Sequence, residues 1–136
     1  MLVSTRGRYA IRIILELASR KNDELGSLSE LSEKQDISLK YAEAIVSLLV
    51  KAELLEGQRG KSGGYRLLKP ASKIMVGDIL KLTEESLAPV ACLDCKPNEC
   101  PKAKTCKTLP MWEHLNFLIS DYLFSVSIED LSKGKV

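Results

Sequence analysis

The sequence predicts a mainly α-helical fold with a small β-element. Three observations predict it. Apolar residues recur at helical spacing from the N-terminus to about residue 52, a basic glycine-rich turn separates two short strand-like segments at residues 54–68, and a second long helical pattern covers residues 111–126. Helices joined to one tight hairpin give the fold class of a winged helix-turn-helix domain followed by a long C-terminal helix.

Composition limits the classes of protein that the chain fits. Its 136 residues, 45% hydrophobic and 28% charged, suit a single modest globular core. No apolar run approaches the roughly 18 residues that a membrane span needs, and the segment MLVSTRGRYA lacks the apolar core of a signal peptide. We therefore expect a cytoplasmic protein with no membrane partner, in which thiols stay reduced. The net charge is only +2, so any nucleic-acid binding must depend on local clusters of basic residues and not on the overall charge.

Three helices are expected in the first part of the chain. Ser4 or Thr5 can cap the first helix, because both side chains accept hydrogen bonds from free backbone amides. The segment Ser27–Glu30 has the pattern of a capping box and starts a short helix that ends near Gln35. Ser38 follows a tight turn and caps a third helix that runs to about Ala52.

The second and third helices form a helix-turn-helix pattern, in which the second helix of the pair enters the DNA major groove. Residues at its start, predicted to contact DNA, are Ser38, Lys40, Tyr41 and Glu43. Helical hairpins are common, so these polar residues also fit a solvated helix surface.

The hairpin that follows favours the DNA-binding interpretation. Strands are expected at Leu54–Gln58 and Tyr65–Leu68, and Arg59 and Lys61 lie at the tip between them. A helix-turn-helix followed by such a hairpin is a winged helix, whose wing brings arginine to phosphates or the minor groove. Basic residues at the N-terminus, Arg6 and Arg8, are predicted to contact the same DNA. The alternative is a charged hairpin tip that keeps the chain in solution.

A short helix at Val76–Leu82 and a long one at Met111–Val126 complete the chain. Apolar residues of the long helix recur at spacings of three and four: Leu115, Leu118, Ile119, Tyr122 and Leu123. Symmetric DNA-binding proteins use such a helix to form homodimers, although it can also pack on its own chain. We expect a DNA-binding domain at 1–84, a cysteine-rich loop at 85–108, and a dimerisation helix with a tail at 109–136.

All four cysteines lie in that loop, with the spacing C-x2-C-x4-C-x5-C: Cys92, Cys95, Cys100 and Cys106. Converging thiolates serve disulfides, a soft metal ion or an iron–sulfur cluster. A reducing cytoplasm argues against disulfides. Zinc in an all-cysteine site remains an alternative, since tetrahedral thiolate is its usual closed geometry.

Several motifs together resemble one bacterial family of winged-helix repressors, which includes the regulators IscR, NsrR and CymR. They are Ser4-Thr-Arg-Gly-Arg-Tyr-Ala10, Ile37-Ser-Leu-Lys-Tyr-Ala-Glu43, Arg59-Gly-Lys-Ser-Gly-Gly-Tyr65, Val76-Gly-Asp-Ile79, Trp112 and Val126-Ser-Ile-Glu-Asp-Leu131. The resemblance implies homodimers on operator DNA whose binding is modulated by a cluster in the loop. It implies repression of genes for iron–sulfur assembly, sulfur metabolism, or the redox or nitric-oxide response.

The ligand set follows the family only in part. Cluster-binding members use three cysteines of this loop and one further ligand. The pair Cys100 and Cys106 matches the family spacing, and either Cys92 or Cys95 can be the first ligand. The family's histidine position holds Leu109, and Ser4–Tyr9 contains no acid, so the extra cysteine is the simplest fourth ligand. We expect a 2Fe–2S cluster in preference to 4Fe–4S, with zinc as the alternative.

An enzyme is not expected. A catalytic cysteine needs a histidine and an orienting acid, and the only histidine is His114, which we interpret as a surface residue of the long helix. The turn Gly60–Gly63 lacks the spacing of a P-loop and lies between strands.

Overall fold

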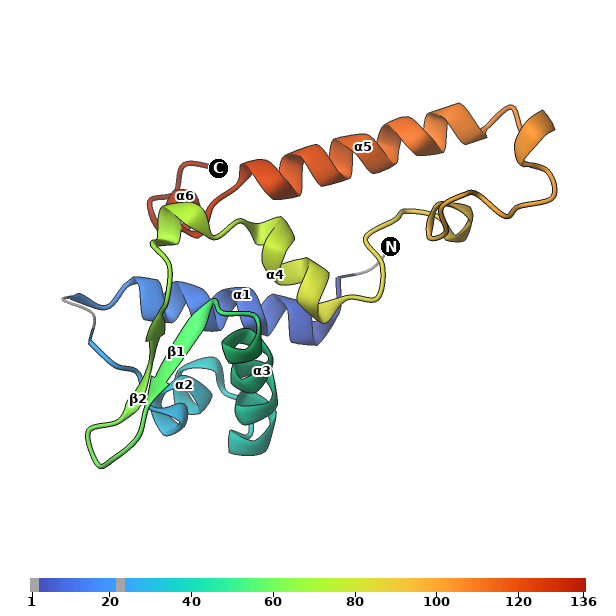
Figure 1. Cartoon of the computed structure of the whole chain (residues 1–136). Coiled ribbons are helices and arrows are strands. Elements are labelled where there is room, and N and C mark those ends of the chain that lie inside the picture. The colour runs from blue at the N-terminus through green and yellow to red at the C-terminus, as the bar shows by residue number, and fades with distance from the viewer. Residues whose placement is uncertain (1–2, 22–23) are drawn as a thin grey trace.

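The computed structural model describes residues 3–21 and 24–136. Three helices and a hairpin form the body, and α5 projects away from it (Figure 1). The cysteine-rich loop connects the end of α4 to the far end of α5. The elements are α1 (Thr5–Ala18), α2 (Leu28–Gln35), α3 (Leu39–Lys51), β1 (Leu55–Gln58), β2 (Gly64–Leu67), α4 (Val76–Thr83), α5 (Leu109–Ser125) and α6 (Ile128–Ser132). This arrangement confirms the predicted fold class.

The first three helices begin at the serines predicted to cap them. The hydroxyl oxygens of Ser4, Ser27 and Ser38 accept hydrogen bonds from the backbone amides of Gly7, Glu30 and Tyr41. Their apolar faces form the core, with α1, α2 and α3 each contributing fully buried side chains: Ile13, Ile14, Leu31, Ile45 and Leu49. Burial of such a side chain stabilises the fold by about 1.5–3 kcal/mol. Helical spacing places these side chains on one face of each helix, and the helices pack with those faces inward.

The hairpin pairs β1 with β2 in antiparallel register, with Leu55 opposite Leu67. A second contact fixes it to the connection between α1 and α2, because the backbones of Gly26 and Tyr65 exchange hydrogen bonds of 2.9 and 2.8 Å. A β-carbon at Gly64 would lie 2.6 Å from the Gly26 carbonyl oxygen, so only glycine allows this approach. The wing is thereby held rigidly against the helices.

The chain after α5 returns to the body and forms α6, which the sequence analysis did not predict. Ser127 and Asp130 form a reciprocal capping box, and their hydrogen bonds lower the pKa of the Asp130 carboxyl. Ile128 is fully buried, and its amide donates to the carbonyl of Ile74. The amide of Val76, the first residue of α4, donates to the carbonyl of Val126. The two ends of the α4–α5 segment are therefore tied together.

None of the helices within the described residues is both long enough and apolar enough to cross a membrane.

Candidate DNA interface and cysteine-rich loop

The start of α3 is exposed and well defined. Asp36 ends α2 in the left-handed conformation, with φ 53°, which turns the chain sharply into α3. The Ser38 hydroxyl accepts the Tyr41 amide at 3.1 Å, so Ser38 acts as the helix cap and keeps its own proton for another acceptor. Lys40 and Glu43 are exposed on the first two turns. The predicted residues of the recognition helix are thus presented together at one end.

Tyr41 has a different position from its neighbours, because its ring is half-buried. It meets the ring of Tyr9 in α1 edge-to-face, with centroids 6.2 Å apart. The guanidinium of Arg12 lies 5.5 Å from the centroid of Tyr9. The start of α3 is therefore packed against the first half of α1.

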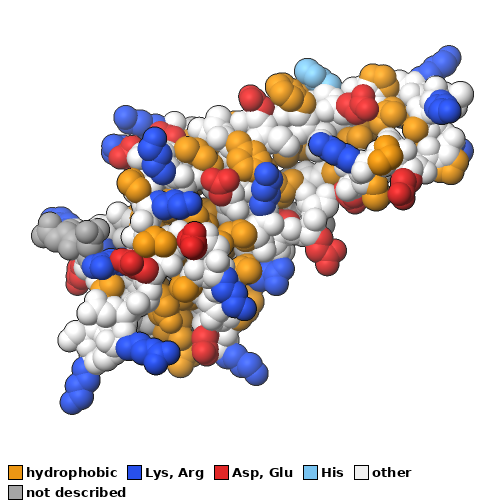
Figure 2. All heavy atoms as spheres, in the orientation of Figure 1, with side chains coloured by type: hydrophobic (Ala, Val, Ile, Leu, Met, Phe, Trp, Pro, Cys, Tyr) orange, Lys and Arg blue, Asp and Glu red, His pale blue; other side chains and the backbone are white. Residues whose placement is uncertain are grey.

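The tip of the wing carries exposed basic side chains. Arg59 and Lys61 flank Gly60, whose φ of 117° is one that L side chains rarely adopt. In Figure 2 lysine and arginine side chains project from the lower left of the molecule, where Figure 1 places the tip of the hairpin. Because both side chains are exposed at the tip, a DNA phosphate can reach them without a clash with the rest of the protein.

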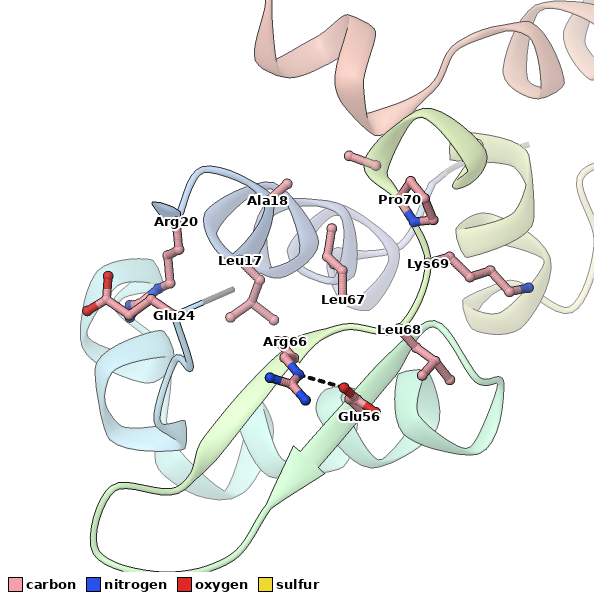
Figure 3. Close-up of a pocket in the computed structure, with 11 residues that line it drawn as sticks. Leu17, Ala18, Arg20, Glu24, Glu56, Arg66, Leu67, Leu68, Lys69 and Pro70 are labelled. Atoms are coloured by element: carbon pink, nitrogen blue, oxygen red, sulfur yellow. Dashed lines mark hydrogen bonds and ion pairs between the residues drawn. The ribbon is translucent and has the colours of Figure 1, made fainter. Parts of the chain in front are cut away.

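A hollow of about 600 Å³ lies at the base of the wing, between the end of α1 and β2 (Figure 3). Its walls carry both charge signs, and Arg66 Nε donates to Glu56 Oε1 at 2.5 Å across the two strands. Charges of both signs do not select one class of ligand. The ion pair joins the two strands of the hairpin, and the hollow is lined by none of the predicted site residues.

The predicted N-terminal arginines lie away from the wing, at the start of α1. Arg6 is tethered to α4, since its Nη2 donates to the Thr83 carbonyl at 2.6 Å. Arg8 Nη2 donates to the Thr5 hydroxyl at 3.2 Å. Both residues are exposed, and a guanidinium has five N–H donors, so each retains donors for a phosphate.

The cysteine-rich loop has little regular structure. Between α4 and α5 it contains only two short 3-10 turns, η3 (Ala91–Leu93) and η4 (Ala103–Thr105). All four cysteines are free thiols, Cys95 being exposed and the other three half-buried. No three His, Cys, Asp or Glu side chains within residues 3–21 and 24–136 gather as a metal-binding group. The thiols share a loop without converging on one point.

Two contacts in the loop bear on thiol chemistry. Cys106 Sγ lies 3.3 Å from the Thr108 hydroxyl, and hydrogen bonds to the side chain and backbone of Thr108 lower the pKa of the Cys106 thiol. Asn98 Oδ1 accepts the amide of Cys100 at 2.9 Å. This bond leaves Asn98 Nδ2 buried with no acceptor among the described residues. The sequence did not single out Thr108 and Asn98, because neither side chain is of a usual metal-ligand type.

The structure groups the predicted site residues in three places: the start of α3, the tip of the wing, and the cysteine loop with the nearby start of α1. His114 lies apart from the thiols, exposed on α5 and stacked on Phe117. Glu84, at the end of α4, also lies at the start of α1, where it accepts hydrogen bonds from Ser4. Sequence reasoning missed it, because no local pattern connects residues so far apart in the chain.

Comparisons with known proteins agree with this geometry. A family model for iron-dependent transcriptional regulators, Rrf2, matches residues 3–134. A helix-turn-helix regulator from Neisseria meningitidis is 38% identical over 99% of this chain and 90% of its own length. The regulator IscR of Vibrio campbellii is 34% identical over 98% of this chain and 78% of its own.

Solved structures give the same result. The global cysteine regulator CymR of B. subtilis superposes with a TM-score of 0.82 and 31% identity, covering 98% of this chain and 97% of its own. IscR from T. potens gives a TM-score of 0.76 and 29% identity, covering 100% of this chain and 89% of its own. The relatives are named as transcriptional regulators, which confirms the expectation that the chain is not an enzyme. The chain belongs to the Rrf2 family of transcriptional regulators.

Proposed function

We propose that this regulator is a repressor that binds operator DNA as a homodimer in the cytoplasm, and that an iron–sulfur cluster held by its cysteine loop modulates this binding. The observation that carries the proposal is the position of four free thiols in one loop between α4 and α5, on a winged-helix body. The division into 1–84, 85–108 and 109–136 follows the same three functions.

DNA binding is assigned to the start of α3, to the tip of the wing and to the N-terminal arginines. Lys40 and Tyr41 lie at the start of the recognition helix, and Arg59 and Lys61 lie at the wing tip. Cations there neutralise phosphate, whereas Glu43 can accept a hydrogen bond from a cytosine amino group in the major groove. Ser38, Arg6 and Arg8 keep hydrogen-bond donors for the backbone of the same duplex.

Dimerisation is assigned to α5. None of its residues is buried within the chain, although most are apolar. Phe117, Leu118 and Tyr122 are 59%, 49% and 60% exposed. An apolar helix surface this exposed is unfavourable in water and is typical of a protein interface. A second copy of the chain covers it in our proposal, which gives the two-fold symmetry that operators share.

The loop fits an iron–sulfur cluster in its donor chemistry. The thiols Cys92, Cys95, Cys100 and Cys106 supply four soft ligands, and none is used in a disulfide. Asn98 Nδ2 is a buried donor with no acceptor among the residues that the structure describes, and a cluster sulfur could supply one. The thiols must be drawn together to bind one centre, and a loop with only two short turns presents little structure against that change. A bound cluster would supply a centre whose loss or oxidation the loop can report.

The relatives suggest which genes are controlled. One neighbour is named a global cysteine regulator and others are named IscR. We therefore propose genes of iron–sulfur assembly, sulfur metabolism, or the redox or nitric-oxide response. We favour 2Fe–2S over 4Fe–4S, and a closed zinc site is the alternative that the four thiols also fit.

Anaerobic purification followed by iron, acid-labile sulfide and zinc analysis tests the cluster. We expect brown protein with iron and sulfide in comparable amounts. Serine variants of all four cysteines then identify the ligands: Cys100→Ser and Cys106→Ser should abolish the visible absorption, and Cys92→Ser and Cys95→Ser should each weaken it. Full colour in one of the last two identifies a non-ligand. Colourless reconstituted protein that holds zinc would contradict the proposal.

A further inference from the structure

Glu84 is the last residue before the cysteine loop and the acceptor at the start of α1. Its carboxylate accepts the Ser4 hydroxyl at 2.6 Å and the Ser4 amide at 3.2 and 3.3 Å. The Thr83 hydroxyl donates to the same carboxylate at 3.1 Å. Ser4 is itself the N-cap of α1. A negative charge at a helix N-terminus is favourable, so Glu84 stabilises the start of α1 through both charge and hydrogen bonds.

The contact is close as well as polar. A β-carbon at Gly7 would lie 2.3 Å from Glu84 Oε1 and 2.9 Å from Thr83 Oγ1, so only glycine lets α1 approach the end of α4 this closely. Beside it, Arg6 donates to the Thr83 carbonyl. One short segment, Thr83–Glu84, therefore holds Arg6, which is predicted to contact DNA. The same segment supplies the carboxylate that stabilises the start of α1.

This contact continues to the recognition helix on one side. Ser4 and Tyr9 belong to the first turns of α1, and Tyr9 packs edge-to-face on Tyr41 at the start of α3. A helix moves as a unit over so short a distance. Displacement of the start of α1 therefore reaches Arg6 directly and Tyr41 through one ring contact.

On the other side the contact continues into the loop. Ser86, two residues after Glu84, donates its hydroxyl to Asp94, and the amide of Ala88 donates to Ser86. Asp94 lies between Cys92 and Cys95. These contacts connect the backbone between Cys92 and Cys95 to Ser86, which lies two residues after Glu84.

We propose that Glu84 is a positioning residue that couples the cysteine loop to DNA binding. This inference rests on the proposed function, because it requires a metal-dependent loop. When the loop draws its thiols together, the segment after residue 84 moves and changes the hold of the Glu84 carboxylate on Ser4. The start of α1, with Arg6 and Tyr9, changes position accordingly. In this proposal Glu84 acts through its hydrogen bonds with Ser4 and not by binding DNA or metal.

The test compares operator affinity in two states of the full-length protein. Each variant is loaded anaerobically with iron and sulfide, or stripped with a chelator, and titrated against a duplex selected from a random pool by the wild-type protein. Allosteric coupling changes affinity by about 5- to 150-fold in typical proteins, so the wild-type ratio of the two affinities should differ clearly from one. Glu84→Ala and the milder Glu84→Gln are the test variants, and Glu85→Ala, an exposed neighbour, is the control.

We expect both Glu84 variants to keep the iron content and dimeric state of the wild type. In each variant the operator affinities of the loaded and stripped states should differ by no more than about twofold. Glu85→Ala should keep the wild-type ratio. Gly7→Ala, which displaces the carboxylate from the other side of the contact, should reproduce the effect. Hydrogen exchange at the amides of residues 4–9 should differ between loaded and stripped wild type, and not in Glu84→Ala.

Three results overturn the inference, and they can be told apart. A wild-type ratio retained in Glu84→Ala means that the coupling bypasses this residue. Loss of iron from Glu84→Gln as well as from Glu84→Ala means that Glu84 builds the loop instead of transmitting its state. A wild-type ratio of one removes metal-dependent DNA binding, and with it both the proposed function and the role of Glu84.

Discussion

The ring of Phe124 in α5 lies directly against the backbone of Gly77 in α4. A β-carbon on residue 77 would be 2.6 Å from the nearest ring atoms, closer than real contacts allow. On the same ring, the Lys81 ammonium lies 4.6 Å from the centroid. These contacts fix the direction in which α5 leaves the body, and hence where it carries the cysteine loop (Figure 1).

Gly77→Ala should therefore destabilise the fold. Overpacking a tight contact costs about 1–3 kcal/mol, which exceeds the roughly 0.5–1 kcal/mol that alanine gains over glycine in a helix. Denaturant unfolding should show a net loss of stability. The double variant with Phe124→Leu should recover part of that loss, because the smaller side chain can move away. Equal stability of Gly77→Ala and wild type would mean that the two helices separate easily.

Much of the body could be predicted from the sequence, because helix caps and apolar faces depend on residues that are close together in the chain. The serines at 4, 27 and 38 cap helices in any context, and apolar residues at helical spacing identify the buried faces. The α6 turn was missed although Ser127 and Asp130 form a capping box, since five residues are too few for a periodic pattern. The capping box at Ser27 formed only in part: Glu30 pairs with Arg20 at 2.7 Å instead of returning to Ser27.

The wing prediction concerns salt. Arg59→Ala removes an exposed cation at the tip, so operator binding should weaken and the log–log slope of affinity against salt should fall by roughly one unit for a lost phosphate contact. Lys135→Ala removes an exposed charge near the C-terminus and should leave the slope unchanged. An Arg59→Ala variant with wild-type affinity and slope would place Arg59 outside the interface.

The second DNA prediction separates sequence readout from general affinity. Glu43 is exposed on α3, where its carboxylate can select cytosine at a cost of repulsion from phosphate. Glu43→Ala should lose discrimination of about 1–3 kcal/mol at one base pair while general affinity stays equal or rises. Competition between matched and single-mismatch duplexes measures this, with Glu33→Ala on α2 as control. Uniform weakening on every duplex would argue against readout.

The dimer prediction uses the exposed surface of α5. Leu118→Glu would bury an unpaired charge in an apolar interface, which costs several kcal/mol unless the interface opens. Sedimentation should show a folded monomer with poor operator binding. Leu68→Glu, at a leucine 46% exposed outside α5, should remain dimeric. A Leu118→Glu variant that remains dimeric would mean that a different surface joins the protomers.

The cysteine loop shows where sequence reasoning stops. Spacing identifies four thiols in one loop, but their relative positions depend on contacts that no local pattern encodes, such as Asn98 with Cys100 and Thr108 with Cys106. The same holds for Ser4 and Glu84, which are 80 residues apart. The prediction that both Cys92 and Cys95 bind the cluster is left to the serine variants, which also show whether only one of them is a ligand.

The most direct test of the central claim is operator affinity of one anaerobic preparation before and after its metal is removed. The same duplex, salt and protein concentration are used, and the Cys106→Ser variant serves as a protein that cannot hold the cluster. We predict that stripped wild type and Cys106→Ser bind alike, and that loaded wild type differs from both by at least about fivefold. Identical affinities for all three would contradict the claim that the loop controls DNA binding.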